Sequence, residues 1–252
     1  MSYDSQKDWM EGKKRIHEIL NLKNDIEERD KVPTEGEFNF DNGYYSWVTA
    51  VFVDIRNSTE LFTENRKTTT AKVIRAFMSE IIEILKDNPN RREIGIRGDC
   101  VYAIYTNSTK KEDYFIAEKI FKIHTFMMMF NEILKGYNIK PIRIGIGAST
   151  AKELVVKTGR KGSGINNLVW IGKAVSYASQ LSNIANKNGD NVINLTSTFY
   201  ENIVELLEKA KLNKGIKFKF SFKNSPQLGK YYTGCGKINA FDDWIQGGMK
   251  NG

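Results

Sequence analysis

Two aspartates stand where a metal-assisted reaction on a phosphate ester could take place. Asp54 ends the run Trp47–Asp54, which is rich in β-branched and aromatic residues, and Asp99 follows Gly98 inside a predicted strand pair over residues 92–105. Because both lie at the ends of rigid strands, their carboxylates can point into one cleft. Mg²⁺ and Mn²⁺ prefer oxygen ligands, and phosphoryl chemistry often uses two such ions. An Asp after a strand is also a common turn or cap residue, so the pair alone does not establish a metal site.

The segment after Asp54 offers a place for a polyphosphate. It runs from a strand into a helix, so backbone N–H groups near Asn57, Ser58 and Thr59 can face an anion. Ser58 or Thr59 could equally cap the helix, and the two roles are compatible.

The elements around these residues alternate between strand and helix. Residues 5–30 carry apolar side chains at helical spacing, and a connector with Pro33, Gly36 and Gly43 follows. We further expect helices at 59–65, 69–87, 112–134 and 172–187, and strands at 141–149, 191–195, 217–222 and 229–233. An antiparallel hairpin inside this alternation is typical of an α+β, ferredoxin-like sandwich, a mostly antiparallel sheet flanked by helices. The sequence therefore predicts an N-terminal helical extension over residues 1–42 and a main domain over residues 43–252.

Composition narrows the class of protein. The 252 residues include 38 basic and 30 acidic ones, for a net charge of +8, which suits a polyanionic partner such as a nucleoside triphosphate. The basic residues are scattered, which argues against nucleic acid, and acids interleave with lysines in residues 5–30, which argues against a membrane surface. We expect a cytoplasmic protein, because the start has no leader pattern, the apolar run Trp47–Ile55 is too short to span a bilayer, and Cys100 and Cys235 form no CxxC pair.

Four segments, in order, resemble the motifs of class III nucleotidyl cyclases. Val51–Thr59 is similar to the first metal motif, usually F-x-D-I-x-G-F-T, and Ile96–Tyr102 is similar to the second, with its Gly-Asp hairpin. Pro141–Gly147 resembles the R-x-G-I-x-x-G strand, and Trp170–Leu181 resembles the W-G-x-x-V-N-x-A-x-R-L helix. Each motif is loose, but four in the right order form a specific signal.

The resemblance implies that residues 43–252 are a cyclase catalytic domain with a two-metal mechanism. Asp54 and Asp99 would bridge two divalent ions, Mn²⁺ or Mg²⁺, with the carbonyl of Ile55 as a further ligand. The ribose 3′-OH of the substrate would attack the α-phosphorus, and pyrophosphate would leave. The resemblance also implies a homodimer with two composite sites, in which one subunit provides the metals and the other contacts the base and the transition state.

Departures from the motifs favour a pyrimidine base. Gly95 and Val169 occupy the positions at which purine cyclases read the base, so neither adenine nor guanine has its usual partner. Arg97 should project beside Asp99, since alternate residues of a strand share a face. Its guanidinium suits a phosphate or a carbonyl-rich base such as uracil, and a salt bridge to Asp99 is the alternative. In this combination the chain resembles the pyrimidine cyclases of bacterial Pycsar antiphage defence, whose product acts on a separate effector.

The helix motif departs at two positions as well. Ser176 replaces the transition-state Asn and can still donate a hydrogen bond, whereas Gln180 replaces an Arg and brings no charge. Loss of one preorganised donor typically lowers the rate by about a hundredfold. Lys173, Lys223 or Lys230 could supply the missing charge.

Several functions follow from these observations. The leading hypothesis is a cyclase that makes cUMP or cCMP, with UTP favoured because Arg97 donates hydrogen bonds and uracil offers more acceptors. Ser176 and Gln180 favour an alternative, a catalytically weak nucleotide-binding sensor. A purine cyclase with unusual base recognition is another alternative, and an RNA-binding module is more distant because no strand shows the stacked aromatic residues that such modules use.

Overall fold

The computed structural model describes residues 5–64, 66–160 and 162–250. Its elements follow in chain order: α1 (Ser5–Leu20), β1 (Asp25–Glu28), the short 3-10 helix η1 (Glu35–Glu37), β2 (Asn42–Arg56), α2 (Ser58–Glu64), α3 (Lys67–Lys86), β3 (Arg91–Arg97), β4 (Cys100–Tyr105), α4 (Lys110–Gly136), β5 (Arg143–Gly159), β6 (Asn166–Gly172), α5 (Lys173–Ile184), β7 (Ile193–Thr196), α6 (Ser197–Leu212), β8 (Ile216–Ser225), β9 (Gly229–Ile238) and α7 (Asn239–Gln246).

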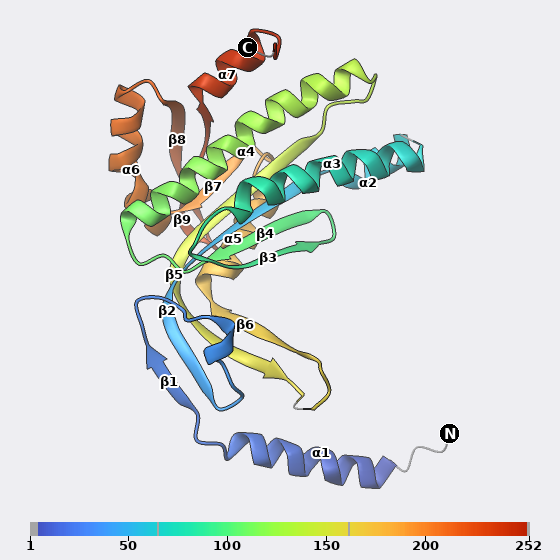
Figure 1. Ribbon diagram of the computed structural model, residues 1–252, viewed down its shortest axis with the longest axis vertical. Helices are drawn as coiled ribbons and strands as arrows, with labels where there is room; N and C mark the ends of the chain where they lie inside the picture. The colour runs from blue at the N-terminus through green and yellow to red at the C-terminus, as the bar shows by residue number, and fades with distance from the viewer. Residues whose placement is uncertain (1–4, 65, 161, 251–252) are drawn as a thin grey trace.

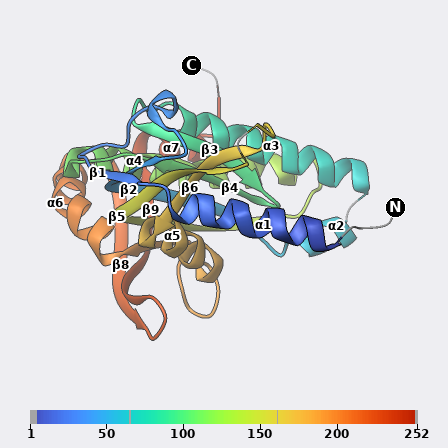
Figure 2. The ribbon, with the colours of Figure 1, turned by 90° about the horizontal axis from the view of Figure 1, so that it is seen from below.

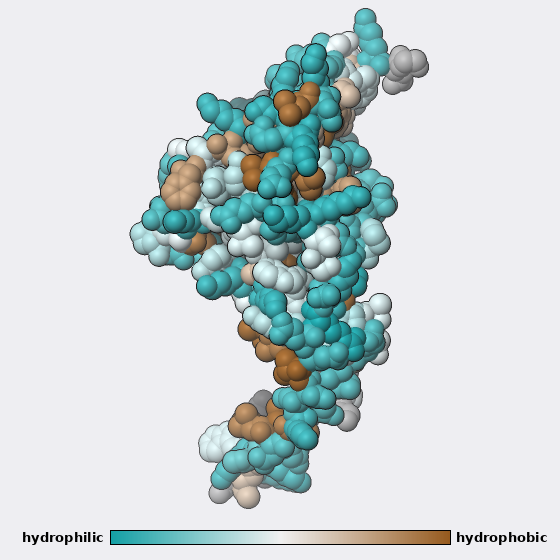
Figure 3. Space-filling view, turned by 90° about the vertical axis from the view of Figure 1, so that its left-hand side faces the viewer, coloured by the Kyte–Doolittle hydropathy of each residue, from teal (hydrophilic) through white to brown (hydrophobic). Residues whose placement is uncertain are grey.

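One nine-stranded sheet runs through the molecule, in the order β3-β4-β2-β5-β7-β9-β8 (Figure 1). Strands β2 and β5 are long enough to leave this body, and there β1 pairs with β2 and β6 pairs with β5. We call this four-stranded part, formed by β1, residues 42–48, residues 152–159 and β6, the ribbon; it is narrower than the body (Figure 3). Only the pairs β1–β2 and β5–β7 are parallel in the described sheet, so the predicted α+β class with a mostly antiparallel sheet is confirmed.

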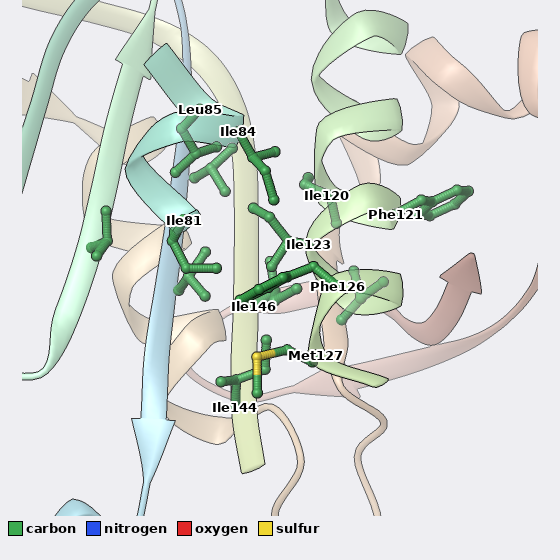
Figure 4. Packing of buried hydrophobic residues seen from close by; sticks show 14 of the residues in the cluster. Ile81, Ile84, Leu85, Ile120, Phe121, Ile123, Phe126, Met127, Ile144 and Ile146 are labelled. Atoms are coloured by element: carbon green, nitrogen blue, oxygen red, sulfur yellow. The ribbon is translucent and has the colours of Figure 1, made fainter. Parts of the chain in front are cut away.

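The main core lies between one face of the sheet and helices α3 and α4. Alternate residues of β2, namely Val51, Val53 and Ile55, face this core, as expected for a strand with helices on both sides. Figure 4 shows side chains from α3 and α4 meeting over Ile144 and Ile146 of β5. A core of this size supports a single large domain without disulfides, and Cys100 and Cys235 are both free thiols.

Helix α5 covers the other face of the sheet, opposite α3 (Figure 2). Ala178 of α5 packs on Ala50 and Phe52 of β2. The helix backbone sits directly on β5, because a Cβ at Gly147 would overlap the backbone of Ala178 and Ser182. The glycines of the segment Pro141–Gly147 therefore set how closely α5 approaches the sheet.

Several predicted boundaries were wrong. The expected helix over residues 5–30 ends at Leu20, and residues 25–28 instead form β1, because they find a parallel partner in residues 42–45. The strand expected at 141–149 continues to Gly159, and Trp170, expected at the start of a helix, lies in β6. Strand β6 and helices α6 and α7 were not predicted. The hairpin over residues 92–105 is confirmed, whereas the division into residues 1–42 and 43–252 stays a prediction.

Within the described residues, none of the helices has both the length and the apolar composition needed to cross a bilayer.

Candidate active site

The β3–β4 hairpin brings Asp99 to the end of β2. Its two-residue turn is Gly98-Asp99, and Gly98 has φ of 64°, the positive value that such tight hairpin turns require at their first position. Cys100 lies directly opposite Asp54 in the β2–β4 register. The backbone N–H of Ile55 donates to the carbonyl of Asp99 at 3.5 Å, so the turn is joined to the residue that follows Asp54. The fold therefore places the backbone of Asp99 beside the end of β2 that carries Asp54, and the shared metal site of the two aspartates stays a prediction.

Asp54 lies in an environment that disfavours an isolated negative charge. Burial raises the pKa of the Asp54 carboxyl, the positive charge of Arg56 opposes this shift, and the Asp99 carboxylate adds to it. Burial also raises the pKa of the neighbouring Cys100 thiol to about 12, so this cysteine stays protonated. Two carboxylates that repel one another in a half-buried site are an arrangement that a bound cation would stabilise.

Arg56 fixes the position of Asp54, and sequence reasoning missed it. Its Nη1 donates to Oδ2 of Asp54 at 2.8 Å, and its side chain is only 2% exposed. The guanidinium also donates from Nε to the carbonyl of Ala185 at 2.9 Å and from Nη2 to the carbonyl of Ser182. These carbonyls lie at the C-terminal end of α5, where a positive charge is favourable. Arg56 thus connects the metal-binding candidate to helix α5, and its i, i+2 spacing from Asp54 was the available signal.

The donors present fit a hard divalent cation. Asp54 and Asp99 supply carboxylate oxygens, and the chain between them and α2 supplies backbone carbonyls such as that of Ile55. No cluster of three or more His, Cys, Asp or Glu side chains that could hold a metal occurs within the described part of the chain. A metal here would therefore be held by the two carboxylates with backbone, substrate and water oxygens, which is the manner typical of Mg²⁺ at phosphate sites.

The predicted anion-facing segment, residues 57–59, directly follows β2 in the chain. Asn57 has φ of 56°, which turns the chain from β2 into α2, and its side chain donates to Oε1 of Glu60 at 3.0 Å. Ser58 is half-buried, and Thr59 is exposed. The structure places these three residues beside the end of β2, and their contact with a phosphate stays a prediction.

Three side chains, which we call the wall, lie over Gly95: Glu93, Tyr102 and Trp170. In the β3–β4 register Tyr102 lies opposite Gly95, and a Cβ at Gly95 would be 2.6 Å from the Tyr102 hydroxyl. The hydroxyl donates to Oε1 of Glu93 at 2.6 Å, and Nε1 of Trp170 donates to Oε2 of the same carboxylate at 2.7 Å. The Tyr102 ring also stacks on Phe52, with centroids 5.3 Å apart. The wall, formed by Glu93, Tyr102 and Trp170, fills the room that glycine leaves.

Arg97 lies on the same face of the sheet as Asp54. It is opposite Cys100 in the hairpin, and Cys100 is opposite Asp54. Its side chain is exposed, and no ion pair between Arg97 and Asp99 is found within the described part of the chain. Its charge is close enough to act on the Tyr102 hydroxyl. Arg97 is therefore free to meet a ligand beside the wall.

The residues assigned to the helix motif point elsewhere. Ser176 and Gln180 are exposed on the outer side of α5, opposite Ala178, and the Ser176 hydroxyl donates to the carbonyl of Gly172 at 2.8 Å. Lys173 begins α5, at the other end of the helix from the Arg56 contacts. Val169 pairs with Val156 of β5, on the opposite face of the sheet from Gly95. Within a single chain, therefore, these side chains do not lie beside Asp54: Val169, Lys173, Ser176 and Gln180.

Two further cations lie near the aspartates. Lys187, exposed in the loop after α5, is close enough to lower the pKa of Asp54 by attraction, although burial dominates. Arg143 is exposed and opposite Arg56 in the β2–β5 register. Of the lysines considered from the sequence, Lys223 is instead held in an ion pair with Asp190. The Arg of the R-x-G pattern was the available signal for Arg143, whereas only the fold reveals Lys187.

Comparison with known proteins agrees with this geometry. Residues 40–217 match the adenylate and guanylate cyclase catalytic domain. A uridylate cyclase from Treponema porcinum is 46% identical over 96% of this chain and 82% of its own length. A uridylate cyclase from Gulbenkiania mobilis is 30% identical over 95% of this chain and 96% of its own length.

Among solved structures, the adenylyl cyclase CyaB from P. aeruginosa superposes with a TM-score of 0.61 at 19% identity, covering 76% of this chain and 95% of that one. This likeness concerns the fold. With a matching family model over most of the chain and relatives of the same family along nearly all of it, the chain belongs to the class III nucleotidyl cyclases, the family of the adenylate and guanylate cyclase catalytic domain.

Proposed function

We propose that the chain is a pyrimidine nucleotide cyclase that converts UTP to cyclic UMP and pyrophosphate. The observation that supports the proposal is the position of the Gly98-Asp99 turn, whose backbone is joined to Ile55 directly after Asp54. Two relatives that align along nearly the whole chain are named uridylate cyclases, which supports the pyrimidine substrate.

The wall over Gly95 supports a small base. A purine extends further from the ribose than a pyrimidine does, and Tyr102 occupies the space that a glycine would otherwise leave for it. Glu93 holds Tyr102 through a hydrogen bond and Trp170 through a second one, so the ring cannot move aside without breaking contacts. Arg97, exposed beside the wall, donates hydrogen bonds that suit the carbonyl oxygens of uracil.

The reaction follows from what the residues near β2 can hold. Asp54 and Asp99 would bind two divalent ions, Mn²⁺ or Mg²⁺. Such ions would lower the pKa of the ribose 3′-OH and neutralise the charge of the triphosphate. Arg56 keeps Asp54 in place through its 2.8 Å contact. Arg143 and Lys187 present positive charge to the β- and γ-phosphates, so that pyrophosphate leaves as the 3′ oxygen joins the α-phosphorus.

The active site is proposed to be complete only in a homodimer. Ser176 and Gln180 face away from the sheet that carries Asp54, so a contact from this side of α5 reaches a nucleotide bound to a second copy. Lys173 and Val169 also lie apart from the aspartates of their own chain. Each subunit would therefore give metal ligands to one site and α5 groups to the other.

We place this chemistry in the cytoplasm, where nucleoside triphosphates are available, and assign it to antiphage signalling in which cyclic UMP acts on a separate effector. The likeness to the Pycsar cyclases described for the sequence supports this role.

The activity is tested by incubating the purified protein with each of the four nucleoside triphosphates and Mn²⁺ and identifying products by mass spectrometry. We expect cyclic UMP to exceed the other products. Cyclic AMP or cyclic GMP as the main product would instead show a purine cyclase. Nucleotide binding without any cyclic product would show the sensor that Ser176 and Gln180 favour.

Variants of the aspartates test the metal assignment. Asp54→Ala and Asp99→Ala should each lose turnover, and Mn²⁺ binding measured by calorimetry should weaken in both. Asp41→Ala removes an exposed carboxylate in the connector and serves as the matched control. Unchanged product formation in either active-site variant would remove the metal assignment.

A further inference from the structure

Helix α1 stands beyond the end of the ribbon and has one apolar face (Figure 1). At about 100° per residue, Trp9, Ile16, Ile19 and Leu20 fall within an arc of about 100°. Their exposed fractions are 71%, 58%, 61% and 75%. Glu18 lies on the opposite side and is also exposed. A helix with such a stripe normally buries it against another element, and α1 does not pack to any comparable extent on another described element of its own chain.

The ribbon has a second uncovered apolar face. In the cross-strand register, Ile26 lies opposite Gly43, which is opposite Val156, and Val156 is opposite Val169. A Cβ at Gly43 would touch both Ile26 and Val156, so these side chains meet over the glycine. We define the ribbon face as the apolar side chains on this side of the four strands: Ile26, Tyr45, Trp47, Leu154, Val156, Val169 and Ile171. The Lys152–Glu28 ion pair lies on the same side, and Lys152 sits over the rings of Tyr45 and Trp47 at one edge of this face.

The ribbon face is open to solvent. Tyr45, Trp47 and Ile171 are exposed by 39%, 36% and 51%, whereas Tyr44 and Val155, on the other side of the same strands, are buried in a small core. Figure 3 shows hydrophobic patches both on the narrow part of the molecule and on the part below it, where α1 lies. Among the residues that the structure describes, two exposed apolar surfaces thus have no partner element, and each could bury the other.

In its own chain α1 lies beyond the ribbon rather than on the ribbon face (Figure 1). The last turn of the helix is closed by hydrogen bonds from Asn21 N to His17 O at 3.0 Å and from Leu22 N to Ile19 O at 3.2 Å, and only residues 23 and 24 then separate it from the outer end of β1. A third bond, from Asp25 N to Asp41 O at 3.0 Å, holds the start of β1 against the connector before β2.

We propose that two copies of this chain exchange their α1 helices, so that the apolar stripe of each α1 packs on the ribbon face of the other copy. A 16-residue helix is about 24 Å long at about 1.5 Å per residue, and four strands spaced about 4.8 Å apart are about 19 Å wide, so helix and ribbon match in size. A strip about 10 Å wide buries about 250 Å² on each side. Two reciprocal contacts then bury about 1,000 Å², the order a specific interface needs. Pairing α1 with α1 would leave both ribbon faces uncovered.

The inference rests on the proposed homodimer but not on the proposed cyclase reaction. Engineered cysteines test the helix exchange separately from the homodimer. Chains with Ile16→Cys and differently tagged chains with Ile171→Cys are mixed, allowed to exchange subunits and oxidised. We expect a disulfide between the two kinds of chain, since the bond forms only when Cβ atoms come within about 4.5 Å. Glu18→Cys, on the polar side of α1, is the matched control and should give little product; each single variant alone reports any bonding through Cys100 or Cys235.

Sedimentation of the unmodified protein decides which proposal has failed if no cross-linked product forms. A dimer without the product would overturn helix exchange and leave the homodimer standing, while a monomer at all concentrations would overturn both. A bond formed within a chain that carries both cysteines, or between two Ile16→Cys chains, would show α1 on its own ribbon or on the other α1 and would also overturn the proposal.

A second measurement uses the dimer itself. Leu20→Glu places a charge in the contact and should raise the dimer dissociation constant by about tenfold or more, because each dimer contains the contact twice. Glu18→Gln should leave it within about twofold. An unchanged dissociation constant for Leu20→Glu would refute the exchange.

Discussion

Gly145 makes room for the arginine that holds Asp54, and replacing it with alanine should disrupt both the fold and the site. A Cβ at this position would lie 2.6 Å from Cζ of Arg56 and 2.6 Å from the carbonyl oxygen of Ser182. The guanidinium cannot move aside cheaply, because it is buried and donates to Asp54 and to the carbonyls of Ser182 and Ala185. Gly145→Ala must therefore either expel the arginine or lift the end of α5 from the sheet.

The size of the effect follows from these contacts. Hydrogen bonds to a charged group contribute about 1.5–3 kcal/mol each, and removing one partner of a buried ion pair typically costs about 3–5 kcal/mol. We expect Gly145→Ala to lower the free energy of unfolding by about 3–5 kcal/mol. For a chain of this size that corresponds to a fall in Tm of about 10 °C. Turnover of UTP should fall at least about tenfold at a temperature where the variant is folded, since Asp54 loses its support.

Urea unfolding followed by tryptophan fluorescence measures the loss, and Gly136→Ala provides the control. Gly136 ends α4, and a Cβ there would meet nothing within 4 Å, so this variant should be neutral or slightly more stable. Arg56→Ala and the double variant complete a cycle. If the arginine is the main obstacle, the double variant should be less destabilised than the sum of the two single variants. A cost below about 1 kcal/mol for Gly145→Ala, or full additivity, would refute the steric reasoning.

Three further predictions concern the base and pH. Tyr102→Ala opens the space over Gly95 and should raise kcat/KM for a purine nucleotide relative to UTP by about tenfold; an unchanged ratio would show that the wall does not set base size. Arg97→Ala should raise KM for UTP by about tenfold or more while the thermal midpoint stays the same, and unchanged KM and selectivity would make Arg97 structural. Burial lowers the pKa of His124 from its ordinary 6.5, so below that pH the unfolded chain takes up a proton that the folded chain does not. The free energy of unfolding should therefore fall as pH falls, by at most about 1.4 kcal/mol per pH unit. Urea midpoints between pH 7.5 and about 5 should show this slope reduced in His124→Gln but retained in His17→Gln, and equal slopes in both would contradict it.

The sequence predicted the parts of the site that lie at the ends of local elements. The β-branched run before Asp54 and the Gly-Asp pair before Cys100 indicate a strand and a tight hairpin, because strand propensity and turn chemistry are written in neighbouring residues. The alternation of strand and helix then gave the α+β class. The same reasoning gave the wrong length for the first helix, because a helical spacing of apolar residues continues past Leu20 while the backbone of residues 25–28 finds a strand partner.

Local sequence alone therefore determined that Asp54 lies near the end of a strand and Asp99 in a tight hairpin turn, and that Gly95 and Arg97 depart from the purine-reading pattern. Tertiary structure alone decided that Tyr102, Glu93 and Trp170 form a wall over Gly95, that Arg56 reaches the end of α5, and that the stripe on α1 is left exposed among the described residues. The physical reason is that a turn or a strand end depends on adjacent residues. The hydrogen bond between Glu93 of β3 and Trp170 of β6, and the contact of Arg56 with the end of α5, depend instead on how distant strands pair. That pairing is set by the burial of the whole sheet.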